Sequence, residues 1–176
     1  MAQTEEKNVI QDAGKPEKDL HSVQLIVFKL GEEEYGLHID QIKEIVRTPN
    51  ITRMPETPDY IKGVANIRGN IIAIADLEKK FGVQARQEEG ETAGNFTLVI
   101  ESEEFKLGVL VKEVPNTLAV PEADIDEALN LVQENNNGET GYIKGVVKLD
   151  DRLIILIDIF KVLEGKDLSL VHRATV

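Results

Sequence analysis

The sequence contains no cysteine and no tryptophan among its 176 residues, and aromatic residues make up only 5%. The absence of cysteine excludes disulfides, thiol nucleophiles and cysteine-ligated metal sites. Positive charge is also scarce, because 20 Lys and Arg stand against 32 Asp and Glu, which gives a net charge of −12. Phosphate backbones and anionic lipids repel such a chain, so we expect neither nucleic acid nor a membrane surface as a partner.

Long apolar runs are missing as well. A run such as Leu153–Ile157 is far too short to cross a bilayer, and the polar residues 1–21 lack the apolar core of a signal peptide. We therefore expect a cytoplasmic protein with a flexible polar tail over residues 1–21, a folded part over 22–165 and a C-terminal tail over 166–176.

The first third of the folded part reads as short strands. Residues 23–30 are apolar and β-branched, and residues 35–39 follow a Gly-Glu turn as their partner strand. Prolines interrupt residues 48–59, which predicts a loop there. Between these segments, residues 40–47 are predicted to form a short helix with one apolar face, because three isoleucines recur at helical spacing: Ile39, Ile42 and Ile45.

A hairpin and a capped helix follow. Residues 61–75 are two apolar stretches around the turn Arg68-Gly69-Asn70, which predicts a β-hairpin. Asp76 is suited to cap a short helix that runs to Phe81, and Gly82 is suited to end it.

An internal repeat organises the whole chain. Tyr60–Val64 (YIKGV) recurs as Tyr142–Val146, and the same offset matches Ile72 with Ile154, Asp76 with Asp158 and Lys79 with Lys161. The two copies, roughly 22–83 and 95–165, are each too small to bury a large core alone. We therefore predict an all-β fold with a few short helices, in which two five-stranded β-barrels pack together around a shared hydrophobic core. Exchange of strands between the barrels is left open.

The sequence offers little for catalysis. No zinc-ligand spacing or serine-nucleophile motif occurs, and the three histidines are scattered, at His21, His38 and His172. Asp76 and Asp158 each follow an apolar strand, as a phosphorylated aspartate does, but both also precede a helical turn and suit a capping role. We expect no catalytic residue, metal or cofactor. A phospho-aspartate phosphatase and a small-molecule-binding signalling module remain the alternatives.

One stretch departs from the acidic composition. Residues 43–68 hold five basic and only three acidic residues. Arginines on loops suit pairing with carboxylates of a protein partner, whereas the competing interpretation is a set of solvated surface charges.

The run Tyr60–Leu77 (YIKGVANIRGNIIAIADL) resembles the CheW family, the coupling proteins of bacterial chemotaxis. Further motifs agree with that resemblance over about residues 22–165, among them Phe28–Gly36, Ile42–Ile45, Thr52-Arg53, Pro58, Gly108–Val111 and Leu153–Asp158. The sequence departs from the family pattern at three positions, where the family usually has Pro, Val and a basic residue: Ala73, Ala75 and Glu78.

The resemblance implies two SH3-like barrels and a non-enzymatic scaffold. Such a scaffold bridges the histidine kinase CheA to the cytoplasmic tips of methyl-accepting chemotaxis receptors, and is thereby recruited to membrane receptor arrays. It implies a receptor-binding groove formed by Ile39, Ile42, Ile45 and Val111. Glu44 and Arg68 match polar positions that the family uses at partner surfaces. With Arg53 and Lys62 of the basic stretch, they complete the expected contacts with kinase or receptor.

Overall fold

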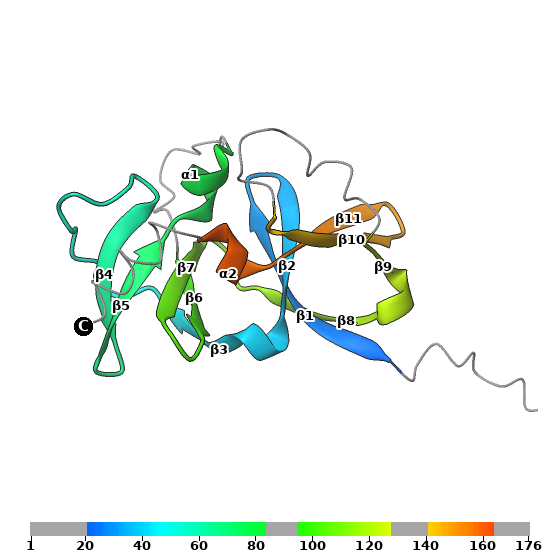
Figure 1. Ribbon diagram of the computed structural model, residues 1–176, viewed down its shortest axis with the longest axis horizontal. Helices are drawn as coiled ribbons and strands as arrows, with labels where there is room; N and C mark the ends of the chain where they lie inside the picture. Colours follow the sequence, from blue (N-terminus) through cyan, green and yellow to red (C-terminus); the bar gives the residue numbers. More distant parts are fainter. Residues whose placement is uncertain (1–20, 84–94, 128–140, 164–176) are drawn as a thin grey trace, which may run out of the picture.

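The strands of the computed structural model form two sheets, each curled into a barrel-like half (Figure 1). The structure describes residues 21–83, 95–127 and 141–163. In chain order the elements are β1 (Ser22–Leu30), β2 (Glu33–His38), the 3-10 turn η2 (Ile39–Gln41), β3 (Ile42–Arg47), β4 (Ile61–Ile67), β5 (Asn70–Ala75), α1 (Leu77–Phe81), β6 (Phe96–Glu101), β7 (Lys106–Val111), β8 (Asn116–Pro121), the 3-10 turn η3 (Glu122–Asp124), β9 (Ile125–Asp126), β10 (Ile143–Leu149), β11 (Arg152–Ile157) and α2 (Ile159–Val162).

Each sheet takes strands from both copies of the repeat. One sheet has the order β8-β1-β2-β11-β10-β9, and the other has the order β3-β6-β7-β5-β4. Where the copies meet, β2 pairs in parallel with β11 and β5 pairs in parallel with β7. The predicted all-β class with two barrel-like halves is confirmed. One half has six strands rather than five, because η3 separates β8 from the two-residue strand β9.

The core between the halves is shared. Its largest apolar cluster joins residues of both sheets, among them Leu37 of β2, Leu98 of β6 and Ile157 of β11. Stacked aromatic rings extend across it, with centroid separations of 6.4 Å for Phe28 and Tyr35, 5.6 Å for Tyr35 and Phe81, and 5.0 Å for Phe81 and Tyr142. Since Phe81 and Tyr142 come from different copies of the repeat, this stack is part of what holds the halves together.

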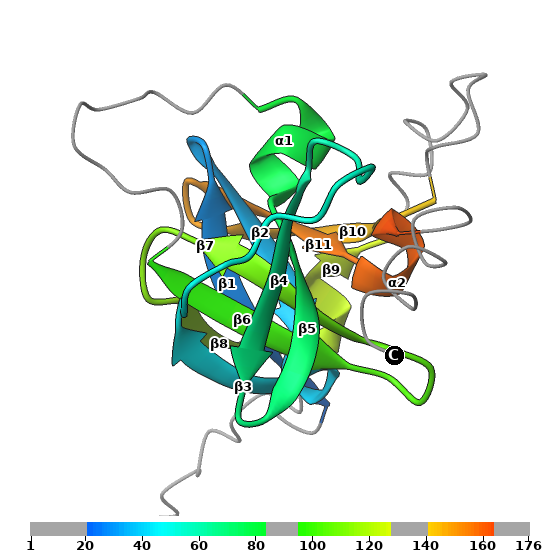
Figure 2. The ribbon, with the colours of Figure 1, turned by 90° about the vertical axis from the view of Figure 1, so that its left-hand side faces the viewer.

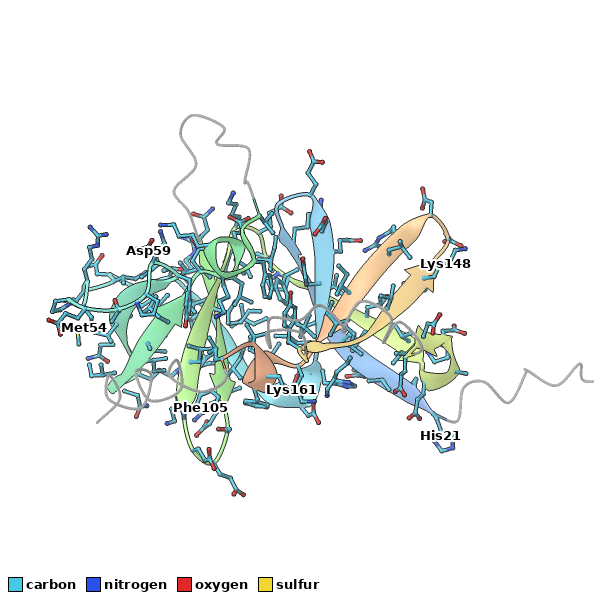
Figure 3. All side chains as sticks on the ribbon, turned by 45° about the horizontal axis from the view of Figure 1, so that its top comes forward. His21, Met54, Asp59, Phe105, Lys148 and Lys161 are labelled. Atoms are coloured by element: carbon cyan, nitrogen blue, oxygen red, sulfur yellow. The ribbon has the colours of Figure 1, made fainter. Side chains whose placement is uncertain are left out.

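The two halves lie at opposite ends of the long axis. Met54 and Asp59, in the segment between β3 and β4, are at one end, and Lys148 of β10 is at the other (Figure 3). Lys161 of α2 lies between them.

The predicted hairpin and helix caps are confirmed. Asp76 accepts hydrogen bonds from the backbone N–H groups of Glu78 and Lys79, and Gly82 ends α1 in the left-handed conformation with φ 66°. Asp158 caps α2 in the same way through the backbone N–H of Phe160.

The helix predicted over residues 40–47 is wrong. Only Ile39–Gln41 make a 3-10 turn, and Ile42–Arg47 continue as strand β3, paired antiparallel with β6. A β-branched run next to another apolar strand favours ladder pairing over an isolated helix of two turns. Residues three apart on a strand point to opposite faces, so Ile42 is half-buried whereas Ile45 faces outward, and a bulge lies between Ile42 and Glu44.

Several predicted segments lie almost wholly outside the described residues. They are the tails at 1–21 and 166–176 and the polar connections at 84–95 and 135–138.

Candidate partner-binding surface

The first part of the candidate surface is η2 with the outward side of β3, which we call the β3 face. Ile39 is 38% exposed and Ile45 is 39% exposed, whereas Ile42 packs against the shared core. Lys43 and Arg47 flank Ile45 on the same outward side of the strand. β3 stands at the end of its sheet order, and outward charges of this kind guard an edge strand against non-specific pairing. The β3 face thus offers large apolar side chains between charges.

An ion pair connects the half-buried Glu44, on the side of β3 opposite Ile45, to the tip of the β4–β5 hairpin. Arg68 Nε lies 2.6 Å from Glu44 Oε2. β3 and β4 are the two ends of this sheet order, so the pair joins the edges of the curled sheet (Figure 2). Arg68 has φ 51° and Gly69 has φ 84°, as expected for a tight hairpin turn, and Asn66 Oδ1 accepts a bond from Gly69 N at 2.9 Å. The turn therefore presents Arg68, whose side chain is 75% exposed, beside β3.

Other basic residues of the 43–68 stretch are also partnered within the chain. Lys43 Nζ lies 2.6 Å from Glu101 Oε2, and Lys106 Nζ lies 3.6 Å from Glu101 Oε1. The hydrogen bond from Lys43, with the charge of Lys106 added, lowers the pKa of Glu101 below its ordinary value. The excess of positive charge in this stretch is thus partly offset by one acid, Glu101, that the fold brings in from β6.

Arg53 and Lys62 lie at a second location, at the opposite end of β4 from Arg68. The residue before Arg53, Thr52, makes a bridge to Val64 through two backbone hydrogen bonds of 2.8 and 2.9 Å. Lys62 Nζ lies 3.7 Å from Asp76 Oδ2. Six residues of extended strand span roughly 20 Å, so the predicted polar contacts divide into two separate groups.

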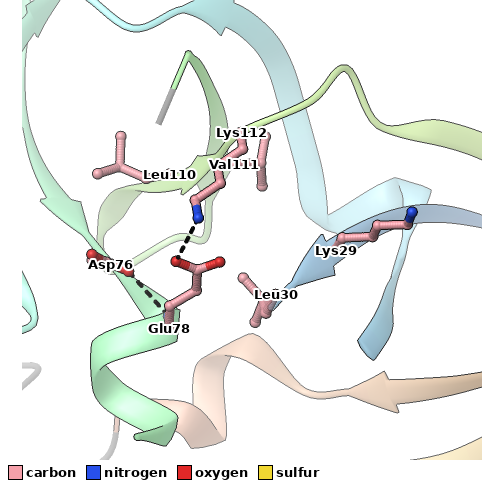
Figure 4. A pocket seen from close by; sticks show the side chains of 7 residues that line it. All are labelled: Lys29, Leu30, Asp76, Glu78, Leu110, Val111 and Lys112. Atoms are coloured by element: carbon pink, nitrogen blue, oxygen red, sulfur yellow. Dashed lines mark hydrogen bonds and ion pairs between the residues drawn. The ribbon is translucent and has the colours of Figure 1, made fainter. Parts of the chain in front are cut away.

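Val111 does not join either group. It is 3% exposed at the end of β7, and it lines a small hollow together with Leu30 of β1 and Glu78 of α1 (Figure 4). Contact between Val111 and a partner would require its side chain to leave the core.

Glu78 occupies the middle of this hollow, and the sequence identified it only as a departure from the family pattern. Its Oε1 accepts a hydrogen bond from the backbone N–H of Gly31 at 3.0 Å, and its Oε2 lies 3.6 Å from Lys112 Nζ. Gly31 follows β1 and Lys112 follows β7, so Glu78 ties α1 to both halves of the molecule. A basic residue at this position could not accept the bond from Gly31.

The described residues offer little that could support catalysis or bind a metal. Across residues 21–83, 95–127 and 141–163 no group of three or more His, Asp or Glu is placed to hold a metal ion. The side chain of Asp76 is engaged as a helix cap and lies beside Lys62. No helix in this part of the chain is long and apolar enough to cross a membrane.

The fold and this surface define a class: a duplicated SH3-like barrel module that presents apolar and charged side chains on edge strands and hairpin tips. Comparison with known proteins makes the class specific. The chain matches the model of the CheW-like domain over residues 24–167.

Relatives cover most of the chain. It is 33% identical over 153 residues to the chemotaxis protein CheW of Helicobacter pylori, a match that covers 86% of this chain and 88% of that protein. It is 34% identical over 150 residues to the CheW of Klebsiella aerogenes, covering 85% and 87%. The crystal structure of the scaffolding protein TtCheW from Thermoanaerobacter tengcongensis superposes with a TM-score of 0.69 at 31% identity, covering 84% of this chain and 91% of that one.

The chain belongs to the CheW-like domain family, which confirms the resemblance carried by Tyr60–Leu77. Its function is that of a chemotaxis coupling adaptor.

Proposed function

We propose that the chain couples the histidine kinase CheA to the cytoplasmic tips of chemoreceptors, so that receptor state controls kinase activity, and that it catalyses no reaction itself. The observation that carries the proposal is the β3 face: two outward isoleucines beside an Arg–Glu pair, in a member of a family of chemotaxis scaffolds. We place this activity in the cytoplasm, at receptor arrays.

The β3 face is the proposed receptor contact. Ile39 and Ile45 are available to insert between side chains of a receptor helix, which is how apolar anchors recognise an amphipathic helix. Ile42 supports them from the core side. Lys43 and Arg47 provide a polar rim, which at interfaces adds more to specificity than to affinity.

The polar residues form the proposed remaining contacts. Arg68 and Glu44 border the β3 face, and their pairing holds the guanidinium in one position before a partner arrives. Arg53 and Lys62, at the other end of β4, are proposed to contact either the kinase or the receptor. The distance between the two groups allows two partners to be bound at once.

The test is Ile45→Asp in pull-downs with a receptor signalling tip and, separately, with CheA. Loss of one buried aliphatic anchor costs about 1–3 kcal/mol, so receptor affinity should fall by roughly five- to hundredfold while kinase affinity is kept. Ile45 is a cleaner position than Ile42, because Ile42 packs on the core and its replacement would also destabilise the fold.

Leu153→Asp is the matched control, since Leu153 is an exposed aliphatic residue on β11 of the other half. It should leave receptor binding intact. Equal loss of both partners in Ile45→Asp, or equal loss of receptor in the two variants, would contradict the assignment of the β3 face.

A turnover assay separates the adaptor from the phosphatase alternative. Added to a phosphorylated response regulator, the purified chain should leave the rate of dephosphorylation unchanged. Added to kinase and receptor together, it should restore receptor control of autophosphorylation. Faster dephosphorylation in proportion to the amount of chain would favour the phosphatase.

A further inference from the structure

The β4–β5 hairpin leaves a large apolar side chain exposed outside the β3 face. Ile71 of β5 is 46% exposed. It lies on the same side of the strand as Ala73, which is buried in the shared core, because side chains two residues apart on a strand point the same way. Its register partner across the hairpin is Asn66, which is polar and exposed as well. The margin of the shared core is therefore open at this end of β5.

Two half-buried phenylalanines extend this apolar surface toward α2. β5 and β7 run in parallel with Ala73 opposite Leu107, and Ile71 and Phe105 each precede that register by two residues. Phe105 packs against the shared core and makes an edge-to-face contact with Phe160 of α2, with ring centroids 5.6 Å apart. Since exposed apolar side chains carry information when they gather rather than when they are scattered, we treat these three residues together. We call Ile71, Phe105 and Phe160 the β5–α2 patch.

More sequence follows α2, and its pattern suits this patch. Leu163 comes directly after α2 and is buried in the core cluster that borders the patch. In the sequence beyond it, Leu168 and Leu170 alternate with Ser169, as in an extended segment with one apolar side. An extended chain covers at most about 3.6 Å per residue, so Leu170, seven residues beyond Leu163, can reach to about 25 Å from it.

We propose that this C-terminal segment docks on the β5–α2 patch of its own chain and covers Ile71. Leu168 and Leu170 contact the patch, and Ser169 faces water between them. A segment tethered to α2 meets the patch at a much higher effective concentration than a separate molecule does, which favours it over a second copy of the chain. The match to the CheW-like domain ends just before Leu168, so this cover belongs to the extension of the chain beyond the family domain. The inference does not depend on the proposed partners.

Disulfide trapping in the full chain tests the docking, and the absence of cysteine from the sequence makes the two introduced thiols the only ones. Asn66→Cys places one thiol opposite Ile71, and Ser169→Cys places the other between the two leucines, so every residue of the proposed contact is kept. In the comparison chain Thr175→Cys replaces Ser169→Cys. A glutathione redox buffer gives the effective concentration of each thiol pair. Circular dichroism checks that loss of the hydrogen bond from Gly69 to Asn66 leaves the fold intact.

The ratio of the two effective concentrations distinguishes a docked segment from an undocked one. Ser169 and Thr175 are six and twelve residues beyond Leu163, and doubling a flexible tether lowers the effective concentration only about threefold. For a docked segment we expect a ratio of about tenfold or more in favour of Ser169→Cys. Replacing both leucines, Leu168→Asp with Leu170→Asp, should return the ratio to about threefold.

The repeat supplies a matched control on the other half of the molecule. Lys148 corresponds to Asn66 and is exposed opposite Leu153, the counterpart of Ile71. Lys148→Cys should show no more than the threefold preference for Ser169→Cys. A lower ratio than expected with Asn66→Cys, a full ratio that survives loss of both leucines, or an equal ratio with Lys148→Cys overturns the proposal. A disulfide-linked dimer in place of the internal bond also overturns it, because the occupant of the patch is then a second copy.

Discussion

Among the described glycines, Gly63 is the one whose added side chain would meet the closest neighbour. Its φ is 145°, a conformation that residues with a side chain rarely adopt, and a Cβ added there would overlap the carbonyl oxygen of Thr52. That carbonyl accepts the backbone hydrogen bond of Val64, and Thr52 N donates to Val64 O in return. Gly63→Ala therefore strains the backbone at residue 63. It also pushes Thr52 away from β4, where the bridge to Val64 lies.

The cost follows from these contacts. The unfavourable backbone angle accounts for about 1–2 kcal/mol. Relief of the overlap separates Thr52 from Val64 and loses two backbone hydrogen bonds, each worth about 1 kcal/mol. We expect the free energy of unfolding to fall by about 3–4 kcal/mol, which corresponds to a melting temperature roughly 10 °C lower for a chain of this size.

Urea unfolding followed by circular dichroism measures the effect, and Gly69→Ala is the control. Gly69 also has a positive φ, 84°, but no atom lies within 4 Å of the added Cβ, so only the backbone term of about 1–2 kcal/mol remains. Gly145, the repeat counterpart of Gly63, lacks a positive φ, so Gly145→Ala should cost less than Gly63→Ala and only through its added Cβ, which would lie 2.9 Å from Asp126 O. If Gly63→Ala and Gly69→Ala unfold at the same urea concentration, the overlap with Thr52 is not a real constraint.

Three further predictions follow from single contacts. Asp76→Ala should lower the free energy of unfolding by about 1–2 kcal/mol, and Asp158→Ala should lower it by less, because Asp76 caps two backbone N–H groups and Asp158 caps one. Thermal melts of the two variants measure this order, and a larger loss in Asp158→Ala would contradict it. Arg152 donates two hydrogen bonds to Glu34 and lowers the pKa of that carboxyl. The pair therefore stabilises the fold fully at a pH above the ordinary carboxyl pKa, and this stabilisation is lost as the pH falls below about 4. Glu34→Gln should accordingly lower the urea midpoint at neutral pH, and the difference from the parent chain should shrink in acid rather than grow. Arg68→Asp should leave the circular dichroism spectrum unchanged and weaken one partner complex in pull-downs, because Arg68 stands at an exposed turn; an unfolded spectrum would show that the residue is structural.

The features that the sequence predicted correctly are local ones. The turn at Arg68-Gly69 and the cap at Asp76 depend on residues a few positions apart, and their chemistry is readable in a short window. Strand partners are different. Duplication leaves each strand with two similar possible neighbours, one in each copy, so sequence patterns cannot show that β2 pairs with β11 and β5 with β7. Packing of the shared core makes that choice.

The candidate site was predictable in its residue types and less so in its geometry. Ile39, Ile42 and Ile45 are spaced as on a helix face, but the alternation of strand β3 places Ile42 toward the core and Ile45 toward solvent. That these residues form a strand depends on their partner β6, which lies some fifty residues further along the chain. Val111 shows a similar limit, because it is buried in the core cluster that strands of both sheets build together.

Strand exchange also bears on how a coupling protein can act. The first repeat leaves one sheet at the end of β2 and enters the other at the start of β3, and it crosses through η2, where Ile39 is exposed. The β3 face is therefore built on the segment that joins the two halves. Because each sheet is completed by strands of the other copy, and Glu78 and the aromatic stack add further ties, the relative orientation of the halves is fixed by the core itself. We therefore expect this scaffold to act by holding its partners at a set distance and angle, because an internal rearrangement of the barrels would first have to break the parallel pairing of β2 with β11.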